Sequence, residues 1–456
     1  MVAMKAIDPA TGEVLKEYAN TTADELESRV DRAHRAFLAW RETDFAHRAT
    51  RMRAAAKILR ERAGSLAELM ACEMGKPVRD GRSEAEKCAW VCDYYADESE
   101  RFLADERVET DASTSYVAFR PLGTVLAIMP WNFPFWQVFR FAAPSLMAGN
   151  AALLKHASNV PGCALAIERV LDDAGFPEGL FATLLIGSDV VPRLLADDRV
   201  AAATLTGSVK AGRAVSEVAG KHLKKTVLEL GGSDPYVVLD DADLDSAVEA
   251  CVKSRLINSG QSCIAAKRFI VVDAVLESFE RRFVERMSEA RLGDPMDERT
   301  DVGPQAREDL RDELHDQVRR TVDAGARLLL GGEVPDREGA WYPPTVLADV
   351  RPGMAAFDEE TFGPVAALVR AKDEDDAIAL ANRSRFGLGA AVFTRDPARG
   401  ERIARDRLEA GACFVNGLVK SDPRLPFGGI KESGYGRELG RLGIRELVNA
   451  KTVWVK

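Results

Sequence analysis

The sequence lacks the cysteine and histidine patterns that form disulfide frameworks or hold metal ions. Its seven cysteines include no CxxC pair, and its five histidines form no HxH or HExxH motif. An odd number of scattered cysteines argues against a disulfide framework, so we expect a reducing, cytoplasmic location. We also expect no metal site, because no group of these residues has the spacing of a zinc site.

The sequence has few features of a secreted, membrane-bound or nucleic-acid-binding protein. The starting segment MVAMKAIDPATGE has no apolar run of a signal peptide. Pro121–Phe139 carries no charge, but its prolines and glycine favour a strand, a turn and the start of a helix over a transmembrane helix. The net charge of −10 disfavours general binding to nucleic acids or anionic membranes. We therefore expect neither kind of partner.

The chain is long enough for two or three domains, since it has 456 residues of which 46% are hydrophobic. Helical spacing of apolar residues dominates the first part of the chain, up to about residue 104. Short apolar runs then alternate with helical segments up to residue 230, and a second such series follows. This alternation predicts an α/β protein whose parallel sheets are covered by helices on both faces. Arg107–Arg120 is expected to form a hairpin or strand pair, and Ala450–Lys456 a strand.

Cys263 stands in the stretch Asn258–Arg268, NSGQSCIAAKR, among small and uncharged neighbours. Such neighbours let a substrate approach the sulfur closely, so Cys263 could be a covalent nucleophile. Taken alone, a buried structural cysteine is the more common interpretation. Residues elsewhere in the chain have to decide between these two alternatives.

Further candidates follow predicted strands, where ligands gather in parallel sheets. Asn132 lies in a turn fixed by two prolines, and its neutral amide donor suits an oxyanion hole. Glu229 closes an apolar strand beside two glycines and is a candidate general base. Gly207 and Ser208 open a helix whose N-terminus can bind an anion, and Lys155 could reach ribose or phosphate oxygens. The alternatives are an ordinary turn, a structural salt bridge and a surface lysine.

Five motifs together resemble one family. PWNFP, VLELGGSDP, NSGQSC, EETFGPV and PFGGIKESG occur in the order and spacing of NAD(P)-dependent aldehyde dehydrogenases, over nearly the whole chain. LLKHASNVP and SDPRLPFGG look most like bacterial succinate-semialdehyde dehydrogenases. The resemblance implies oxidation of succinate semialdehyde to succinate with NADP or NAD. Another semialdehyde, a neutral aldehyde or CoA-acylating chemistry are the alternatives, and a structural role without catalysis is disfavoured.

The resemblance also implies a division into domains. A Rossmann-like cofactor-binding domain would comprise residues 1–106 and 123–229, and an α/β catalytic domain residues 230–432. Residues 107–122 and 433–456 would form a β oligomerisation arm, through which the chain would assemble into a homodimer or homotetramer.

The resemblance assigns a role to each candidate. Cys263 matches the nucleophile, whose attack on the aldehyde gives a thiohemiacetal and, after loss of hydride, a thioester. Asn132 would hold the oxyanion, and Glu229 would activate the water that hydrolyses the thioester. The residues at cofactor-contacting positions are Trp131, Lys155, Gly207, Ser208, Glu360 and Phe362.

Substrate and cofactor preference depend on positions where the chain departs from some relatives. Ser158 stands where many NAD-preferring relatives carry a glutamate that repels a 2′-phosphate, so we predict that NADP is accepted. Arg140 lies among aromatic residues and needs an anion, which is either an internal carboxylate or the distal carboxylate of a semialdehyde. The resemblance favours the second, with Ser421 and Arg424 as helpers. Ile257 stands where some relatives carry a second arginine.

A second cysteine stands two residues after the nucleophile in some relatives. Ala265 occupies that position here. We therefore expect no local disulfide switch at Cys263.

Overall fold

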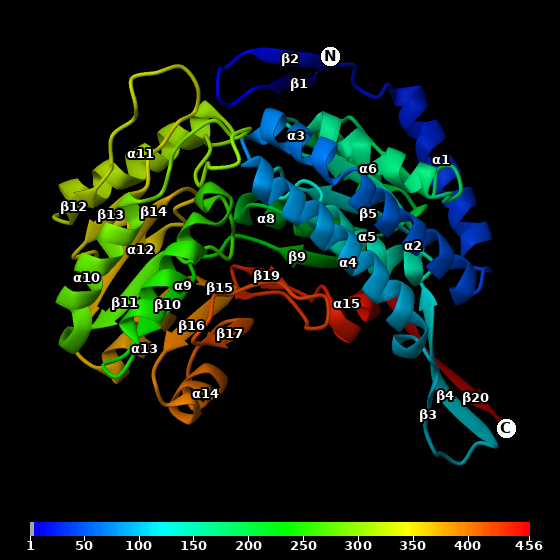
Figure 1. The fold of residues 1–456 in the computed structure, drawn as a ribbon. Coiled ribbons are helices and arrows are strands. Elements are labelled where there is room, and N and C mark those ends of the chain that lie inside the picture. The colour runs from blue at the N-terminus through cyan, green and yellow to red at the C-terminus, as the bar shows by residue number, and fades with distance from the viewer. Residues whose placement is uncertain (1–3) are drawn as a thin grey trace.

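The computed structural model describes residues 4–456, which form two α/β bodies side by side and a projecting ribbon of three strands (Figure 1). The first body is built on a six-stranded sheet with the strand order β19-β9-β8-β5-β6-β7. Neighbouring strands are parallel except for β19, which runs antiparallel to β9. The strands are β5 (Thr124–Met129), β6 (Ala151–His156), β7 (Phe181–Thr183), β8 (Val200–Thr206), β9 (Lys225–Glu229) and β19 (Gly434–Tyr435).

Helices cover both faces of this sheet, as the alternating pattern predicts. On one face, α5 lies between the sheet and α4, and its residues are buried from end to end. On the other face, α1 packs with α7 and α8 over apolar residues of the strands. The helices are α1 (Ala23–Trp40), α2 (Phe45–Glu61), α3 (Ala63–Met74), α4 (Val78–Phe102), α5 (Trp136–Met147), α6 (Pro161–Asp173), α7 (Val191–Ala196) and α8 (Val209–Lys221).

The second body is built on a seven-stranded sheet with the order β12-β13-β14-β11-β10-β16-β17, parallel except at β12. Apolar clusters fill both faces of this sheet. The strands are β10 (Pro235–Val238), β11 (Arg268–Val272), β12 (Arg327–Leu330), β13 (Thr345–Ala348), β14 (Val365–Ala371), β16 (Gly389–Phe393) and β17 (Ala412–Val415). The helices are α9 (Leu244–Leu256), α10 (Asp273–Ser288), α11 (Glu308–Asp323), α12 (Ala355–Asp358), α13 (Glu374–Asn382) and α14 (Pro397–Asp406).

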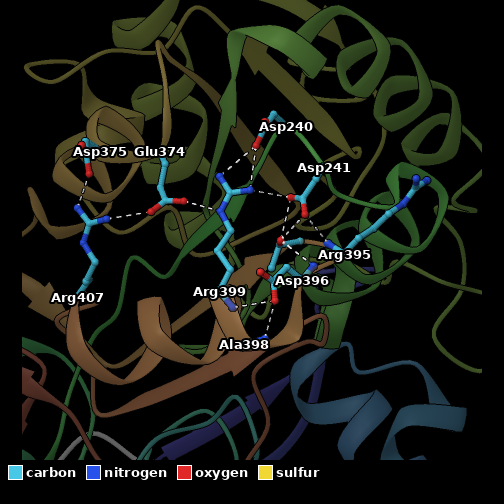
Figure 2. A network of polar contacts seen from close by, with 10 residues as sticks. Asp240, Asp241, Glu374, Asp375, Arg395, Asp396, Ala398, Arg399 and Arg407 are labelled. Atoms are coloured by element: carbon cyan, nitrogen blue, oxygen red, sulfur yellow. Dashed lines mark hydrogen bonds and ion pairs between the residues drawn. The ribbon is translucent and has the colours of Figure 1, made fainter.

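A polar network attaches α14 and α13 to the residues that follow β10 (Figure 2). Arg399 of α14 pairs with Asp240 and Asp241, and it also pairs with Glu374 of α13. Arg407 extends the network through a second oxygen of Glu374. These groups are partly exposed and satisfy one another, so this acidic strand end has a structural role.

The ribbon consists of β3 (Glu106–Arg107), β4 (Thr114–Pro121) and β20 (Val448–Val455), in the order β20-β4-β3. It projects from the first body and confirms the predicted strand pair and terminal strand (Figure 1). The segment before β20 does not project, because β19 pairs with β9 and α15 (Gly440–Glu446) packs on α4 and α5. Across the described residues, no helix has the length and apolarity to cross a membrane.

Short strands complete the fold at its edges. β1 (Met4–Ile7) and β2 (Val14–Tyr18) form an antiparallel hairpin that packs against α3 and α6. β15 (Phe386–Gly387) pairs with β18 (Ile430–Lys431), which joins the loop after β17 to the second body. The hairpin also bonds to the second body, where the amide of Ala340 donates to the carbonyl of Pro9 over 2.8 Å.

Candidate active site

Two cavities meet at Cys263. The larger, of about 680 Å³, lies where the strand ends of the first sheet face the second body. The smaller, of about 260 Å³, lies between α4, α5 and the segment that carries Val419 and Ser421. Cys263 and Gln137 line both cavities. A sulfur at this position can contact one ligand from each side.

The larger cavity gathers most of the residues predicted to contact a cofactor. Trp131 and Phe362 lie edge to face across it, with ring centroids 5.7 Å apart. The residues of the predicted cofactor set that line it are Trp131, Gly207, Ser208, Glu360 and Phe362, and Asn132 joins them. Ser208 is the N-cap of α8, where its Oγ accepts from the amide of Ala211.

Two predicted cofactor residues do not line the larger cavity. Lys155 is the penultimate residue of β6 and is half-buried, and burial lowers the pKa of its ammonium. Ser158 lies at a separate hollow between the N-terminal hairpin and residues 306–309. A nucleotide in the larger cavity would have to extend beyond it to reach either side chain.

The backbone before Cys263 has an unusual conformation. Asn258, Ser259 and Gly260 have φ values of 53°, 57° and 76°, in the left-handed region. Such a conformation costs about 1–3 kcal/mol for a residue other than glycine, so its surroundings must hold it in place. The Asn258 amide donates to the carbonyl of Asn132, and Ser259 Oγ accepts from the amide of Gly303.

Lys267 holds the backbone of the segment that carries Cys263. The sequence does not reveal this role. The Nζ of Lys267 is fully buried and donates to the carbonyl oxygens of Ser262 and Cys263, over 2.8 and 2.6 Å. It also forms an ion pair with Glu360 over 3.6 Å. The lysine therefore links the cysteine to a residue of the predicted cofactor set.

The thiol of Cys263 is neutral in this environment. Burial raises the pKa of Cys263 to about 12, although the charges of Lys267 and Arg140 act to lower it. Before a ligand enters, the thiolate population near neutral pH is therefore very small. Charges or hydrogen-bond donors that arrive with a ligand would have to stabilise the thiolate.

This environment predicts how Cys263 reacts with iodoacetamide when neither cofactor nor aldehyde is present. The alkylation rate should rise about tenfold per pH unit from about pH 7 to pH 10, because only the thiolate reacts. Mass spectrometry of the peptide that contains Cys263 would measure the rate, and Cys263→Ser would show that the signal comes from this residue. A rate that levels off below about pH 8 would contradict a neutral resting thiol.

The predicted oxyanion donor lies beside the nucleophile segment. The Asn132 amide is buried, and its Nδ2 donates to the carbonyl of Gln261 over 3.0 Å. A primary amide has two N–H groups, so one remains to face a ligand in the larger cavity. The prediction of a rigid turn is consistent with this arrangement, since Asn258 holds the backbone carbonyl of Asn132.

Glu229 is buried at the end of β9, but its carboxyl lines neither cavity. Neither of its oxygens has a hydrogen-bond partner within the described structure. Burial raises the pKa of Glu229 well above its usual range; Arg140 acts to lower it and Glu438 raises it further. In this orientation burial favours the protonated carboxyl, and the side chain can turn away without breaking a hydrogen bond.

Arg140 is paired with a carboxylate of the protein itself, which is the first of the two alternatives that the sequence left open. Arg140 forms an ion pair with Glu438, donates to Thr206 Oγ over 3.3 Å and stacks on the ring of Phe427. Its side chain still lines the smaller cavity. Its charge, however, already has a partner inside the protein.

The two predicted helpers of Arg140 differ in position. Ser421 lines the smaller cavity, where its Oγ accepts from Lys87 Nζ over 2.7 Å. Arg424 is exposed, binds Asp422 through two hydrogen bonds and is not part of the lining. Lys87 was not predicted from the sequence, because it looks like any charged residue of an amphipathic helix.

Comparison with known proteins identifies the family. The aldehyde dehydrogenase family model matches residues 2–453. The chain therefore belongs to the aldehyde dehydrogenase family, and it is an NAD(P)-dependent aldehyde dehydrogenase. This confirms the resemblance that the five sequence motifs indicated.

Individual relatives are similar along their whole length. The chain is 52% identical to a probable NADP(+) succinate-semialdehyde dehydrogenase of Synechocystis, covering 100% of both chains. It is 50% identical to an NAD(P)+ succinate semialdehyde dehydrogenase of Escherichia coli, covering 98% of this chain and 97% of the relative. A succinic semialdehyde dehydrogenase of Streptococcus pyogenes, solved with NADP+, is 38% identical with a TM-score of 0.97, covering 99% and 100%. This solved structure confirms the α/β fold.

Proposed function

We propose that this enzyme oxidises succinate semialdehyde to succinate and uses NADP in preference to NAD. The observation that carries the proposal is the position of Cys263 between a large and a small cavity. The smaller cavity has room for an aldehyde of a few carbon atoms, and cationic side chains line it. The relatives at about half identity are named for the same substrate.

The larger cavity fits a nicotinamide dinucleotide. It combines the N-terminus of α8, suited to a pyrophosphate, with the aromatic pair Trp131 and Phe362 and the carboxylate of Glu360. These residues would hold the cofactor, with Lys155 and Ser158 beyond the cavity at its ribose. When bound, NADP supplies the hydride acceptor of the reaction.

Three residues of the chain, Cys263, Asn132 and Glu229, would each have one role in the oxidation. The Cys263 sulfur adds to the aldehyde carbon and gives a thiohemiacetal, whose oxygen is held by the Asn132 amide. Loss of hydride and of the hydroxyl proton leaves a thioester on the same sulfur. Glu229, turned towards the thioester and ionised, takes a proton from water, which attacks the carbonyl and releases the acid and the thiol.

A pair of substrates tests the proposed specificity. Because a carboxylate gains a charge-assisted contact in the cavity, we expect kcat/KM for succinate semialdehyde to exceed that for butanal by about 100-fold or more. The rate of NADP reduction with each substrate measures it, and butanal serves as the neutral compound of the same chain length. Equal values for the two aldehydes would contradict the substrate assignment.

Ser158 is proposed to permit the 2′-phosphate of NADP. We expect Ser158→Glu to lower kcat/KM for NADP by about 10- to 100-fold through charge repulsion and to leave NAD less affected. Steady-state kinetics with both nucleotides would show this, with Ser158→Ala as the matched uncharged control. Better use of NAD than NADP by the wild type, unchanged in Ser158→Glu, would contradict this role.

We also infer that the enzyme is a cytoplasmic homodimer or homotetramer that assembles through the ribbon. In support, β20 is an edge strand with the exposed apolar residues Trp454 and Val455. Pairing such an edge with a second copy would satisfy its free backbone groups. The sedimentation of the wild type and of a chain with a charged residue at Trp454 would test the assembly.

A further inference from the structure

Lys87 places an ammonium group in the wall of the smaller cavity. It extends from α4, its Nζ donates to Ser421 Oγ over 2.7 Å, and it lies 4.2 Å from the centroid of the Trp136 ring. In the part of the chain that the structure describes, Lys87 has no ion-pair partner. Lys87 is half-buried, and a charge partly removed from water without a partner is costly, so this position favours a compensating anion.

The neighbouring carboxylates Glu84 and Asp422 act to raise the pKa of Lys87, but each forms its ion pair with another cation. Glu84 forms an ion pair with Lys76 and accepts from the amides of Phe135 and Trp136. Asp422 is bound by both ends of the Arg424 guanidinium. Asp80 also lines the cavity and forms an ion pair with Arg79 over 3.8 Å, so none of these carboxylates is paired with Lys87 and an anion from outside the protein can take that place.

The other cations near the cavity are less suited to bind that anion. Arg140 is paired with Glu438, and Arg424 lies outside the lining. Lys420 lines the cavity but is exposed, so water screens its charge. Among the described residues, Lys87 is thus the half-buried cation that shares a cavity with Cys263 and has no ion-pair partner.

We propose that Lys87, together with the hydroxyl of Ser421, binds the distal carboxylate of the aldehyde and thereby determines specificity. Arg140 lines the same cavity as a fixed, neutralised part of its wall. The inference rests on the proposed function, since it identifies the group that recognises a semialdehyde. Recognition therefore depends on a residue from α4, far in sequence from the cysteine segment.

The experiment compares Lys87→Met with the wild type, with succinate semialdehyde and butanal as substrates. Methionine keeps the length of the side chain and removes its charge. We expect kcat/KM for succinate semialdehyde to fall about 30- to 100-fold, while that for butanal changes less than about threefold, as loss of one charge-assisted hydrogen bond predicts. Lys57→Met, at an exposed lysine of α2 that lines neither cavity, is the matched control, and it should change neither value more than about threefold.

A second measurement separates this inference from the substrate assignment. Succinate should inhibit butanal oxidation by the wild type, and its inhibition constant should rise about 30-fold or more in Lys87→Met. If the wild type does not favour succinate semialdehyde but this dependence on Lys87 holds, the substrate assignment fails and the anion site stands. If both the selectivity and the inhibition constant are the same in Lys87→Met as in the wild type, Lys87 is not the anchor.

The pH dependence offers a third readout. Burial, with the nearby Arg140, lowers the pKa of Lys87 to about 8, so its charge is present below that pH and is lost above it. The other titratable or charged groups around it are Glu84 and Cys88 on α4, Asp80 and Cys263 at the cavity, and Lys420 and Asp422 on the loop. KM for succinate semialdehyde should rise above about pH 8 relative to that for butanal, and Lys87→Arg should abolish this rise. The same rise in Lys87→Arg would overturn the assignment.

Discussion

Replacing Cys263 with serine is expected to abolish aldehyde oxidation, with kcat lowered by at least about 10³-fold. A serine hydroxyl ionises far less readily than a thiol and is a weaker nucleophile. Its size is similar, so the hydrogen bonds of Lys267 to the backbone carbonyls of residues 262 and 263 should survive. The formation of reduced nicotinamide, followed by absorbance, measures the loss.

Nucleotide binding supplies the control for this variant. Cys263→Ser should bind NADP with an unchanged Kd, measured by calorimetry, because the residues that line the larger cavity remain in place. Cys72→Ser, a change at another partly exposed cysteine on α3, should retain full activity. Substantial aldehyde oxidation by Cys263→Ser would show that the nucleophile lies elsewhere.

Glu229→Gln is expected to separate the two halves of the reaction. Steady-state turnover should fall about 10²- to 10⁴-fold, because an amide cannot accept the proton of the attacking water. Thioester formation does not need this base, so the first turnover should remain fast. Rapid mixing should therefore show a burst of about one reduced nicotinamide per active site, followed by slow turnover.

The pH profile of the same variant gives a further check. The pKa of Glu229 is raised by burial, so the carboxyl is protonated at low pH and becomes a base as the pH rises. Turnover of the wild type should increase with pH where hydrolysis limits the rate, and Glu229→Gln should lose this dependence. A variant without a burst would assign Glu229 to the first half-reaction instead. Fast release by CoA rather than by water in the wild type would favour the CoA-acylating alternative.

The sequence predicted the fold through its alternating apolar runs and helical segments. Two of the short apolar runs, Val125–Ile128 and Ala201–Leu205, lie within β5 and β8, and β20 begins two residues before the predicted Ala450. Short connections between strand and helix make this pattern readable from local sequence. The packing of α15 on α4 and α5 was not predicted, because it depends on contacts between distant parts of the chain.

The sequence predicted those site residues that stand in a recognisable motif. It did not predict the residues that only tertiary packing brings to the site. Cys263 and Asn132 stand in motifs, and the structure brings them together. Lys87 reaches Ser421 across 334 positions of sequence, and no local pattern marks that contact. The ion pair of Arg140 with Glu438 also joins residues far apart in the sequence, and it favours one of two alternatives that the sequence had left open.

The placement of Cys263 between two cavities has a consequence for inhibitor design. A compound that occupies only the smaller cavity should compete with the aldehyde and leave the affinity for nucleotide unchanged. A compound whose two ends occupy both cavities would bind more tightly, because binding of one end raises the effective concentration of the other at its own cavity. Gln137 also lines both cavities, so a linker that passes the sulfur would have a polar side chain beside it.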